Sequence, residues 1–284
     1  MKAPLELTGL TKVFDTPAGP FIAVKDVNAV VAAGEFVAIL GHSGCGKSTV
    51  LSMIAGLVNA TYGGVIIDGK EVDEPGAERG MVFQSPCLLP WLNARQNVAL
   101  AHRQATGMTP ALRARMASPD GYLAMVGVAE AADQLPAQLS LGTQQCVSLA
   151  RALSLEPRFL LLDEPFSMLD SLTRFELQDT LLRVWEGRRV RTHLNESAMT
   201  VVMVTHDVDE ALYLADRLIL MTDGPEATVG EVLQVPFARP RVRAEVLAHP
   251  EYHACRRRVI DFLDHHAHQS RASALDSVLR RRAG

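Results

Sequence analysis

The sequence predicts an α/β fold built on a mainly parallel sheet, with an antiparallel β subdomain at the N-terminus and an inserted α-helical subdomain. Three observations support this prediction. Short apolar runs typical of buried strands recur along the chain, helical stretches separate them, and one run leads directly into a glycine-rich loop. The 284 residues are 48% hydrophobic and 21% charged, which is ordinary for a globular protein with a large core.

The composition disfavours several classes of protein. The formal net charge is only -4 and the charges are interleaved, so no clustered basic face indicates nucleic acid. The four cysteines lack a CxxC or other metal-like spacing, which is typical of a reducing compartment. The first ten residues lack the features of a secretion signal, and no apolar run approaches the roughly 20 residues of a membrane span. We therefore expect a cytoplasmic protein that meets a membrane only through another subunit.

The N-terminal part is predicted to be antiparallel β-structure. Apolar residues alternate or cluster in Leu5 to Leu10 and in Val24 to Val31, and Asp15 to Pro20 supplies turn residues between them. Glu35 to Leu40 then predicts a buried strand, and Ser48 to Leu57 predicts a helix. The order of strand, glycine loop and helix is typical of the start of an α/β core.

A helical subdomain is predicted at about residues 86–155, where Ala, Leu, Gln and Arg are frequent and β-branched residues are few. Buried strands resume at Phe159 to Leu162 and at Thr200 to Val204, and a helix over Ser171 to Trp185 separates them. We therefore expect a main domain of residues 1–235, which contains the helical subdomain. An extension of residues 236–284 follows, with an amphipathic helix at His253 to His265.

The segment Gly41 to Ser48 (GHSGCGKS) matches the P-loop pattern GxxxxGK[ST] and predicts a P-loop NTPase core. Glycines let backbone N–H groups converge on phosphate oxygens, and the following helix directs its positive end at the same anion. Lys47 would reach the β and γ phosphates of ATP, and the Ser48 hydroxyl would bind Mg²⁺. The expected nucleotide contacts of this loop are Gly41, His42, Ser43, Gly44, Cys45, Gly46, Lys47, Ser48 and Thr49.

Further polar residues follow the predicted strands. Asp163 would join the coordination of Mg²⁺, and Glu164 would orient or deprotonate the attacking water. His206 is placed for a γ-phosphate contact, and Gln84 for the metal or its water. Taken alone, the acids leave open a strand that is simply capped by carboxylates, the histidine is more often an ordinary surface or core residue, and the glutamine is weak evidence. The neighbouring P-loop favours the catalytic interpretation, with Lys47, Glu164 and His206 as catalytic residues and Ser48, Gln84 and Asp163 at the metal.

Over nearly the whole chain the order of these motifs resembles the ATP-binding cassette (ABC) family. The shared motifs are the P-loop, Gln84, a signature-like Leu139 to Gln145 (LSLGTQQ), Asp163 with Glu164, Ser167 to Asp170, and His206. The resemblance implies a dimer of cassettes, with ATP between the P-loop of one and the signature of the other. It implies that Ser140 and Gly142 face the opposing γ-phosphate and that Asp170 is the D-loop acid. It also implies that Phe14 stacks on adenine, although a core position is equally expected for this residue.

The signature differs from the family pattern LSGGQ. Leu141 replaces the first glycine, Thr143 replaces the glutamine, and Cys146 stands where an arginine is usual. Because glycine permits close backbone approach, we expect Leu141 to weaken the ATP site that this signature completes. Alternatively, the chain pairs with a different cassette whose signature is intact, which leaves one strong site.

Other segments resemble the ATPase subunits of bacterial importers. Leu88 to Leu92 (LLPWL) falls where family members receive a membrane subunit, although packing inside the helical subdomain is the alternative. Met221 to Ala227 and Val235 to Arg241 resemble nitrate importers and, less closely, sulfonate, taurine and cyanate importers. The resemblance implies import of a small anion, nitrate or nitrite above all. It further implies a second cassette, two transmembrane permease subunits and an external solute-binding protein, with this chain on the cytoplasmic face of the cell membrane.

Two other function classes stay open. One is a soluble cassette ATPase that acts on nucleic acid or ribosomes, but such families tend to contain long coiled coils or two fused cassettes, and this sequence has neither. The other is a nucleotide-sensing regulatory subunit without turnover. The presence of Lys47, Asp163, Glu164 and His206 favours hydrolysis over that alternative.

Overall fold

The computed structural model describes residues 5–17, 19–104, 117–191 and 198–266. The chain divides into two compact units: unit 1 comprises residues 1–74 and 204–284, and unit 2 comprises residues 75–203. The glycine-rich loop therefore belongs to unit 1, and the acids at 163 and 164 belong to unit 2.

Unit 1 begins with an antiparallel sheet of strand order β2-β1-β4-β5. Its strands are β1 (Leu5–Thr16), β2 (Gly19–Val31), β4 (Tyr62–Ile67) and β5 (Lys70–Glu71). The antiparallel opening is confirmed, and β1 and β2 extend further toward their turn than predicted. The reason is that β-branched and aromatic residues pair across the hairpin there, with Val13 opposite Ile22 and Phe14 opposite Phe21.

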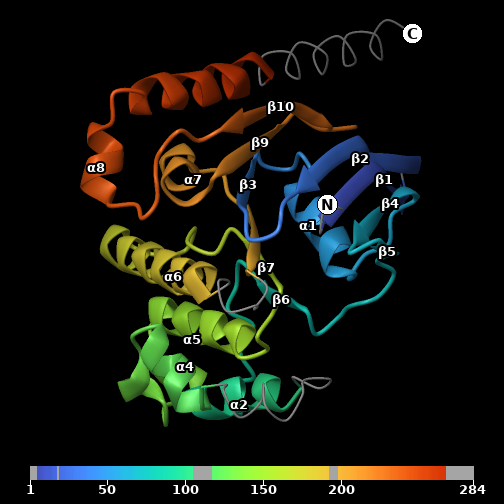
Figure 1. The fold of residues 1–284 in the computed structure, drawn as a ribbon. Coiled ribbons are helices and arrows are strands. Elements are labelled where there is room, and N and C mark those ends of the chain that lie inside the picture. Colours follow the sequence, from blue (N-terminus) through green and yellow to red (C-terminus); the bar gives the residue numbers. More distant parts are fainter. Residues whose placement is uncertain (1–4, 18, 105–116, 192–197, 267–284) are drawn as a thin grey trace, which may run out of the picture. The chain divides into compact units, whose positions relative to one another are not determined.

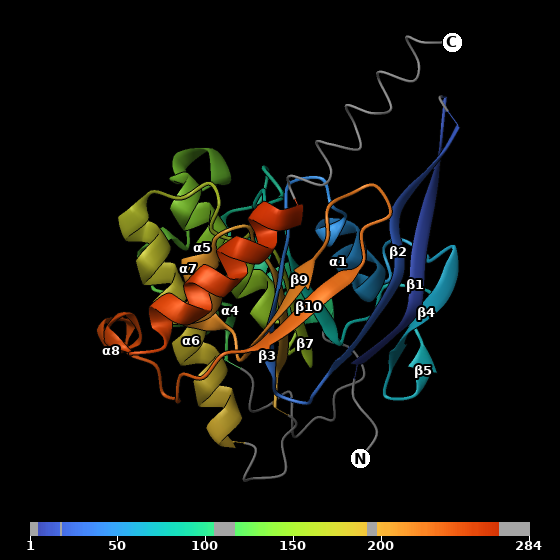
Figure 2. The same cartoon turned by 90° about the horizontal axis from the view of Figure 1, so that it is seen from above.

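The second layer of unit 1 carries the glycine-rich loop. Strand β3 (Phe36–Leu40) pairs in parallel with β9 (Arg217–Met221), which pairs antiparallel with β10 (Val229–Gln234). All five β3 residues are buried, as expected for a strand covered on both faces. Helix α1 (Lys47–Ala55) lies between this layer and the antiparallel sheet (Figures 1 and 2), and α7 (Val208–Leu214) packs on β3.

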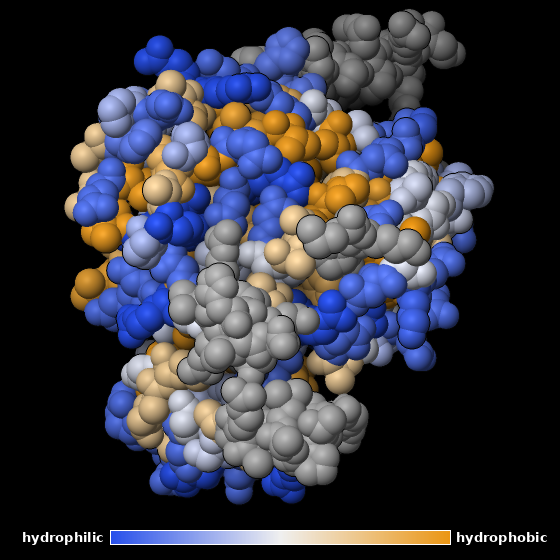
Figure 3. Space-filling view, viewed as in Figure 1, coloured by the Kyte–Doolittle hydropathy of each residue, from blue (hydrophilic) through white to orange (hydrophobic). Residues whose placement is uncertain are grey.

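The C-terminal part of unit 1 contains α8 (Arg243–Ala248) and a helix over residues 252–266, here called the C-terminal helix. Figure 2 shows this helix, coloured red, running alongside β9 and β10. Apolar side chains gather over these two strands in the space-filling view (Figure 3). Val259 of the helix is fully buried, whereas Ile260, Phe262 and Leu263 are half-buried. A helix thus lies where the amphipathic helix was predicted, and its apolar side is partly covered.

Unit 2 combines a sheet with the predicted helices. Its strands β6 (Arg79–Val82), β7 (Phe159–Asp163) and β8 (Thr200–Val204) are neighbours in the order β8-β7-β6, and β6 pairs in parallel with β7. The helices are α2 (Ala94–Gln104), α4 (Pro119–Met125), α5 (Leu141–Leu153) and α6 (Ser171–Arg191), with 3₁₀ turns at Ala129–Ala131 and Pro136–Gln138. Part of the predicted helical subdomain, residues 105–116, lies outside the described residues.

The α/β fold with parallel strands, an antiparallel N-terminal sheet and a helical middle is confirmed. Strands β4, β5, β9 and β10 were not among the predicted strands. In the described ranges, no helix combines the length and the apolar character that a membrane crossing requires.

Candidate active site

The glycine-rich loop joins β3 to α1, and two of its glycines have a backbone conformation that other residues avoid. Gly44 and Gly46 have φ values of +83° and +91°, in the left-handed region. A Cβ on Gly46 would also lie only 2.4 Å from Cγ1 of Val24. Gly46 is the N-cap of α1, so the loop combines a glycine cradle with a helix N-terminus. This combination fits a bound phosphate.

Lys47 lies against this loop with only 4% of its surface exposed. Its Nζ donates to the carbonyl oxygens of Gly41, at 2.8 Å, and of His42, at 2.9 Å. These bonds offset part of the cost of burying an ammonium group. The third ammonium donor faces the Cys45 sulfur at 3.9 Å. Because a thiol sulfur is a weak acceptor, a phosphate oxygen would be the stronger partner for this donor.

Cys45 fills the inside of the loop and is 1% exposed. Burial raises the pKa of its thiol, Lys47 opposes this shift, and Asp223 adds to it. A Cβ on Gly41 would lie 2.6 Å from the Cys45 sulfur. The Cys45 side chain is therefore a packing group, and only its backbone is suited to contact phosphate.

His206 follows β8 and lies in the same unit as the phosphate loop. Thr205, directly before it, donates its backbone N–H to the carbonyl of Ile39 on β3, at 3.2 Å. Asp207, directly after it, caps α7 by accepting two backbone N–H groups of the first turn, both at 3.0 Å. The exposed His206 is thus fixed on both sides, next to the strand that leads into the phosphate loop.

The loop at residues 222–228 packs behind the phosphate loop, a role that sequence reasoning missed. A Cβ on Gly224 would lie 3.2 Å from the carbonyl oxygen of Gly44. The Ala227 carbonyl accepts the backbone N–H of Lys25 at 2.9 Å, and the Lys25 ammonium pairs with Glu226 at 2.7 Å. The sequence offered only a likeness to importer subunits here, and the structure shows that this segment supports the loop.

Phe14 lies near the turn of the β1–β2 hairpin, opposite Phe21. Its side chain is 38% exposed, and the Lys12 ammonium lies 5.2 Å from its ring centroid. The alternative that Phe14 is a core residue is therefore wrong. An exposed ring is available for stacking on a base, and its contact with adenine stays a prediction.

In unit 2, the parallel pairing of β6 with β7 brings Gln84 next to Glu164, because both strands end at the same edge of the sheet. Gln84 Nε2 lies 3.4 Å from Glu164 Oε2 and 3.4 Å from Ser167 Oγ. Asp163 is the last residue of β7. The amide and the two carboxylates expected at the metal and the attacking water thus lie together at one sheet edge.

Glu164 has a φ of +43°, in the left-handed region that costs a non-glycine residue about 1–3 kcal/mol. The turn is held by Ser167, whose Oγ and backbone N–H both donate to the Glu164 carbonyl, at 3.0 and 3.2 Å. Strain of this kind concentrates at functional sites. Five other described non-glycine residues also have a positive φ, so the strain agrees with a catalytic role for Glu164 without singling it out.

The signature-like segment forms the start of α5. Ser140 caps this helix by accepting the backbone N–H of Thr143 at 3.1 Å. A Cβ on Gly142 would lie 2.6 Å from Cγ2 of Thr173, so glycine is needed where α5 meets α6. Leu141 is 40% exposed, which places the substituted side chain at the surface beside the two retained residues.

Two neighbours of the signature have shifted pKa values. Asp170 accepts the backbone N–H groups of Leu172 and Thr173, both at 3.1 Å, and hydrogen bonds from Thr173 lower the pKa of its carboxyl. Burial raises the pKa of the Cys146 thiol to about 11, and Glu176 adds to this shift. At neutral pH the Asp170 carboxyl is therefore charged. The Cys146 thiol is neutral, so it does not supply the positive charge of the arginine that is usual at this position.

Sequence reasoning missed two side chains that hold the loop after Gln84. Asn97 is fully buried and accepts the Leu89 N–H at 2.8 Å, while its Nδ2 donates to three carbonyls of the same loop region. Arg151 of α5 donates to the carbonyls of residues 86 and 87, at 3.3 and 2.8 Å. Trp91 in this loop is 71% exposed. The alternative that Trp91 packs inside the helical subdomain is therefore wrong. The sequence signal for the two side chains that hold the loop was limited to their being polar residues in helical segments.

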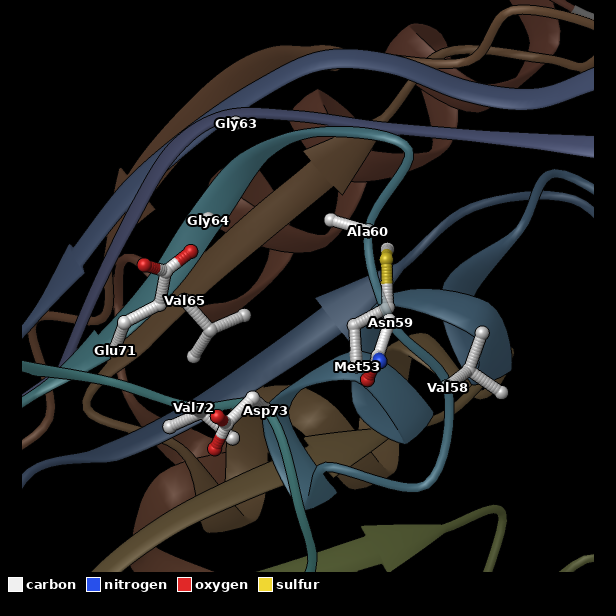
Figure 4. Close-up of a pocket in the computed structure, with 10 residues that line it drawn as sticks. All are labelled: Met53, Val58, Asn59, Ala60, Gly63, Gly64, Val65, Glu71, Val72 and Asp73. Carbon is white, nitrogen blue, oxygen red and sulfur yellow. The ribbon is translucent and has the colours of Figure 1, made fainter.

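Unit 1 also contains a hollow of about 140 Å³ that is unsuited to phosphate (Figure 4). It lies by the C-terminal end of α1, whereas the phosphate loop is at the N-terminal end. Glu71 and Asp73 line it, and none of its ten lining residues is Lys, Arg or His. The acidic lining would repel a nucleotide, so the hollow is separate from the candidate site.

Comparison with known proteins gives consistent results. A model of the ABC transporter family matches residues 24–167. The chain is 49% identical over 252 residues to the nitrate import ATP-binding protein NrtD of Synechococcus elongatus, covering 89% of this chain and 88% of that protein. It is 44% identical over 259 residues to the bicarbonate transport ATP-binding protein CmpD of Synechocystis sp., covering 91% of this chain and 88% of that protein.

A solved structure supports the same assignment. The ATP-binding cassette MJ0796, in a dimeric post-hydrolysis state bound to ADP and Pi, superposes with a TM-score of 0.68. Its sequence is 32% identical, and the match covers 82% of this chain and all of that chain. Family model, relatives and fold agree with the motifs described above, so this chain belongs to the ABC transporter family, as an ATP-hydrolysing cassette of the importer type.

Proposed function

We propose that this cassette binds MgATP and hydrolyses it to drive the import of nitrate or nitrite. The nucleotide role is supported above all by the glycine cradle at the N-terminus of α1, where two carbonyls of the loop hold the Lys47 ammonium. The anion is supported by the 49% identity to a nitrate import subunit. Bicarbonate is the second candidate because another relative, at 44% identity, serves bicarbonate transport, and it was not among the anions expected from sequence.

The residues of unit 1 would hold the nucleotide. The backbone amides from Gly41 to Thr49 and the Lys47 ammonium would bind the phosphates, and the exposed Phe14 ring would stack on adenine. His206, fixed between Thr205 and Asp207, would donate to the γ-phosphate. Each of these groups would bind or orient, without changing its own covalent structure.

The residues of unit 2 would supply the metal and water contacts. Bound Mg²⁺ supplies positive charge that neutralises the phosphates, and Asp163, Gln84 and the Ser48 hydroxyl of unit 1 would hold it. Glu164 would accept a proton from the attacking water. Ser140, Gly142 and Asp170 would act on the nucleotide of an opposing cassette.

Two exposed surfaces support the proposed partners. Trp91 is exposed on a loop held by Asn97 and Arg151, which suits the docking of a transmembrane permease subunit. Met168 and Leu172 are 52% and 70% exposed on either side of Asp170, which suits contact with a second cassette. We infer an assembly of two cassettes, two permease subunits and an external solute-binding protein, with this chain on the cytoplasmic face of the cell membrane.

The hydrolytic role is tested in the assembled transporter by replacing Glu164 with glutamine. We expect retained ATP binding and a loss of turnover of about 10²-fold or more, because the general base is removed. Lys47→Ala should abolish ATP binding, and the exposed Glu130→Gln on a 3₁₀ turn serves as the control. Turnover by Glu164→Gln at the rate of the unmodified protein would contradict the proposal.

The anion and the signature need separate measurements. Uptake and ATPase rates of the reconstituted transporter with its solute-binding protein should rise with nitrate or nitrite, and stimulation by bicarbonate alone would transfer the assignment to that anion.

Leu141→Gly should raise the ATPase rate if the leucine weakens the site. An unchanged rate would contradict the weakened-signature hypothesis.

A further inference from the structure

The C-terminal helix is fixed to unit 1 by polar contacts on two sides. Tyr252 Oη and Arg256 Nε both donate to Asp209, at 2.6 and 2.7 Å. Arg258 Nε donates to Glu231 of β10 at 2.5 Å. The helix therefore has a defined position between the start of α7 and the edge strand β10, and Arg256 and Arg258 form the ion pairs that fix it.

A glycine lets the far end of this helix approach β10. A Cβ on Gly230 would lie 2.6 Å from Cζ and 2.8 Å from Cε2 of Phe262. The Phe262 ring thus lies directly on the backbone of the strand. A larger side chain at position 230 would have to displace this ring from the strand.

The same end of the helix contacts the phosphate loop. Nε2 of His42 lies 2.9 Å from the carbonyl oxygen of Leu263. Because a carbonyl only accepts, Nε2 must carry the proton that is donated. The backbone carbonyl of His42 accepts from the Lys47 ammonium at 2.9 Å. One residue of the phosphate loop is therefore bound on one side to the C-terminal helix and on the other to the phosphate-binding lysine.

We propose that the C-terminal helix braces the phosphate loop and that His42 is the positioning residue that connects them. The His42 imidazole points to Leu263, so it acts on the nucleotide through the conformation of the loop. A loop that is already held in shape loses less conformational freedom when ATP binds. Loss of the His42 hydrogen bond would therefore weaken ATP binding by about two- to tenfold, the effect of one ordinary hydrogen bond.

This inference rests on the proposed nucleotide site, and a pair of variants tests it. The side-chain nitrogen of glutamine reaches the place of histidine Nε2, whereas that of asparagine corresponds to Nδ1. His42→Asn should raise the dissociation constant and KM for ATP by about two- to tenfold, with the effect on KM rather than kcat, and His42→Gln should recover most of this loss. His253→Asn, an exposed histidine on the same helix, is the matched control.

Phe262→Ala provides an independent test, because it removes the ring that holds this end of the helix on β10 and changes no residue of the phosphate loop. It should weaken ATP binding as His42→Asn does, and the double variant should be no weaker than either single variant. Amide exchange at residues 42–48 should accelerate in both. Unchanged ATP affinity in His42→Asn, or an equal loss in His42→Gln, would overturn the brace. Failure of the unmodified protein to bind ATP would instead overturn the proposed function.

Discussion

Replacing Arg241 with methionine tests whether the segment after β10 stabilises unit 1 through one buried cation. The Arg241 side chain is 1% exposed. Its Nη1 donates to the carbonyls of Tyr213, at 2.9 Å, and Ala215, at 2.8 Å, and longer bonds reach the carbonyls of residues 212 and 237. The first two acceptors end α7, where the helix dipole favours a cation. Arg241 thus caps the helix that begins two residues after His206.

The magnitude follows from the two short bonds. Hydrogen bonds to charged groups contribute about 1.5–3 kcal/mol each, so the two short bonds together contribute about 3–6 kcal/mol. Methionine retains much of the apolar volume but donates nothing. We expect a loss of about 4 kcal/mol in the free energy of unfolding, or roughly 8–16 °C in Tm at 2–4 °C per kcal/mol.

Calorimetric unfolding of the purified chain measures this loss. Arg241→Lys keeps the charge with a single donor centre, so it should recover about half of the stability. Arg257→Ala, which changes an exposed residue of the C-terminal helix, should stay within about 0.5 kcal/mol of the unmodified chain. A methionine variant that unfolds within about 2 °C of the unmodified chain would refute the reasoning, because the carbonyls that end α7 would then not depend on Arg241.

Three further predictions concern unit 2. At pH 8 the buried Cys146, with a pKa of about 11, should react with iodoacetamide far more slowly than the exposed Cys87, because only the thiolate attacks; equal rates in a labelling time course would contradict its burial. Glu164→Gly should raise the free energy of unfolding by about 1 kcal/mol through relief of the φ of +43° while abolishing hydrolysis, and a destabilised variant in urea unfolding would contradict the strain. Asn97→Ala should cost about 2–3 kcal/mol of stability and reduce stimulation of the ATPase by the permease; full stimulation would argue against the loop as the docking site.

Features that depend on contiguous residues were predictable from the sequence. The phosphate loop is a single run between a strand and a helix, and its glycines are required by its own backbone. The predicted strand at Thr200 to Val204 has the same bounds in the structure, because an unbroken apolar run between polar ends leaves little choice. Strands β4 and β10 were missed because glycine and exposed polar residues interrupt their patterns.

Contacts between distant segments were decided only by the tertiary structure. His42 and Leu263 are 221 positions apart, and Arg241 lies 26 to 28 positions from the carbonyls that end α7. A local pattern cannot specify such partners, since each side chain alone is equally compatible with an exposed position. The sequence by itself predicted which residues would carry the ATPase chemistry. Folding alone decided which side chains support them, because a hydrogen bond to a backbone carbonyl places no requirement on the identity of the residue that accepts it.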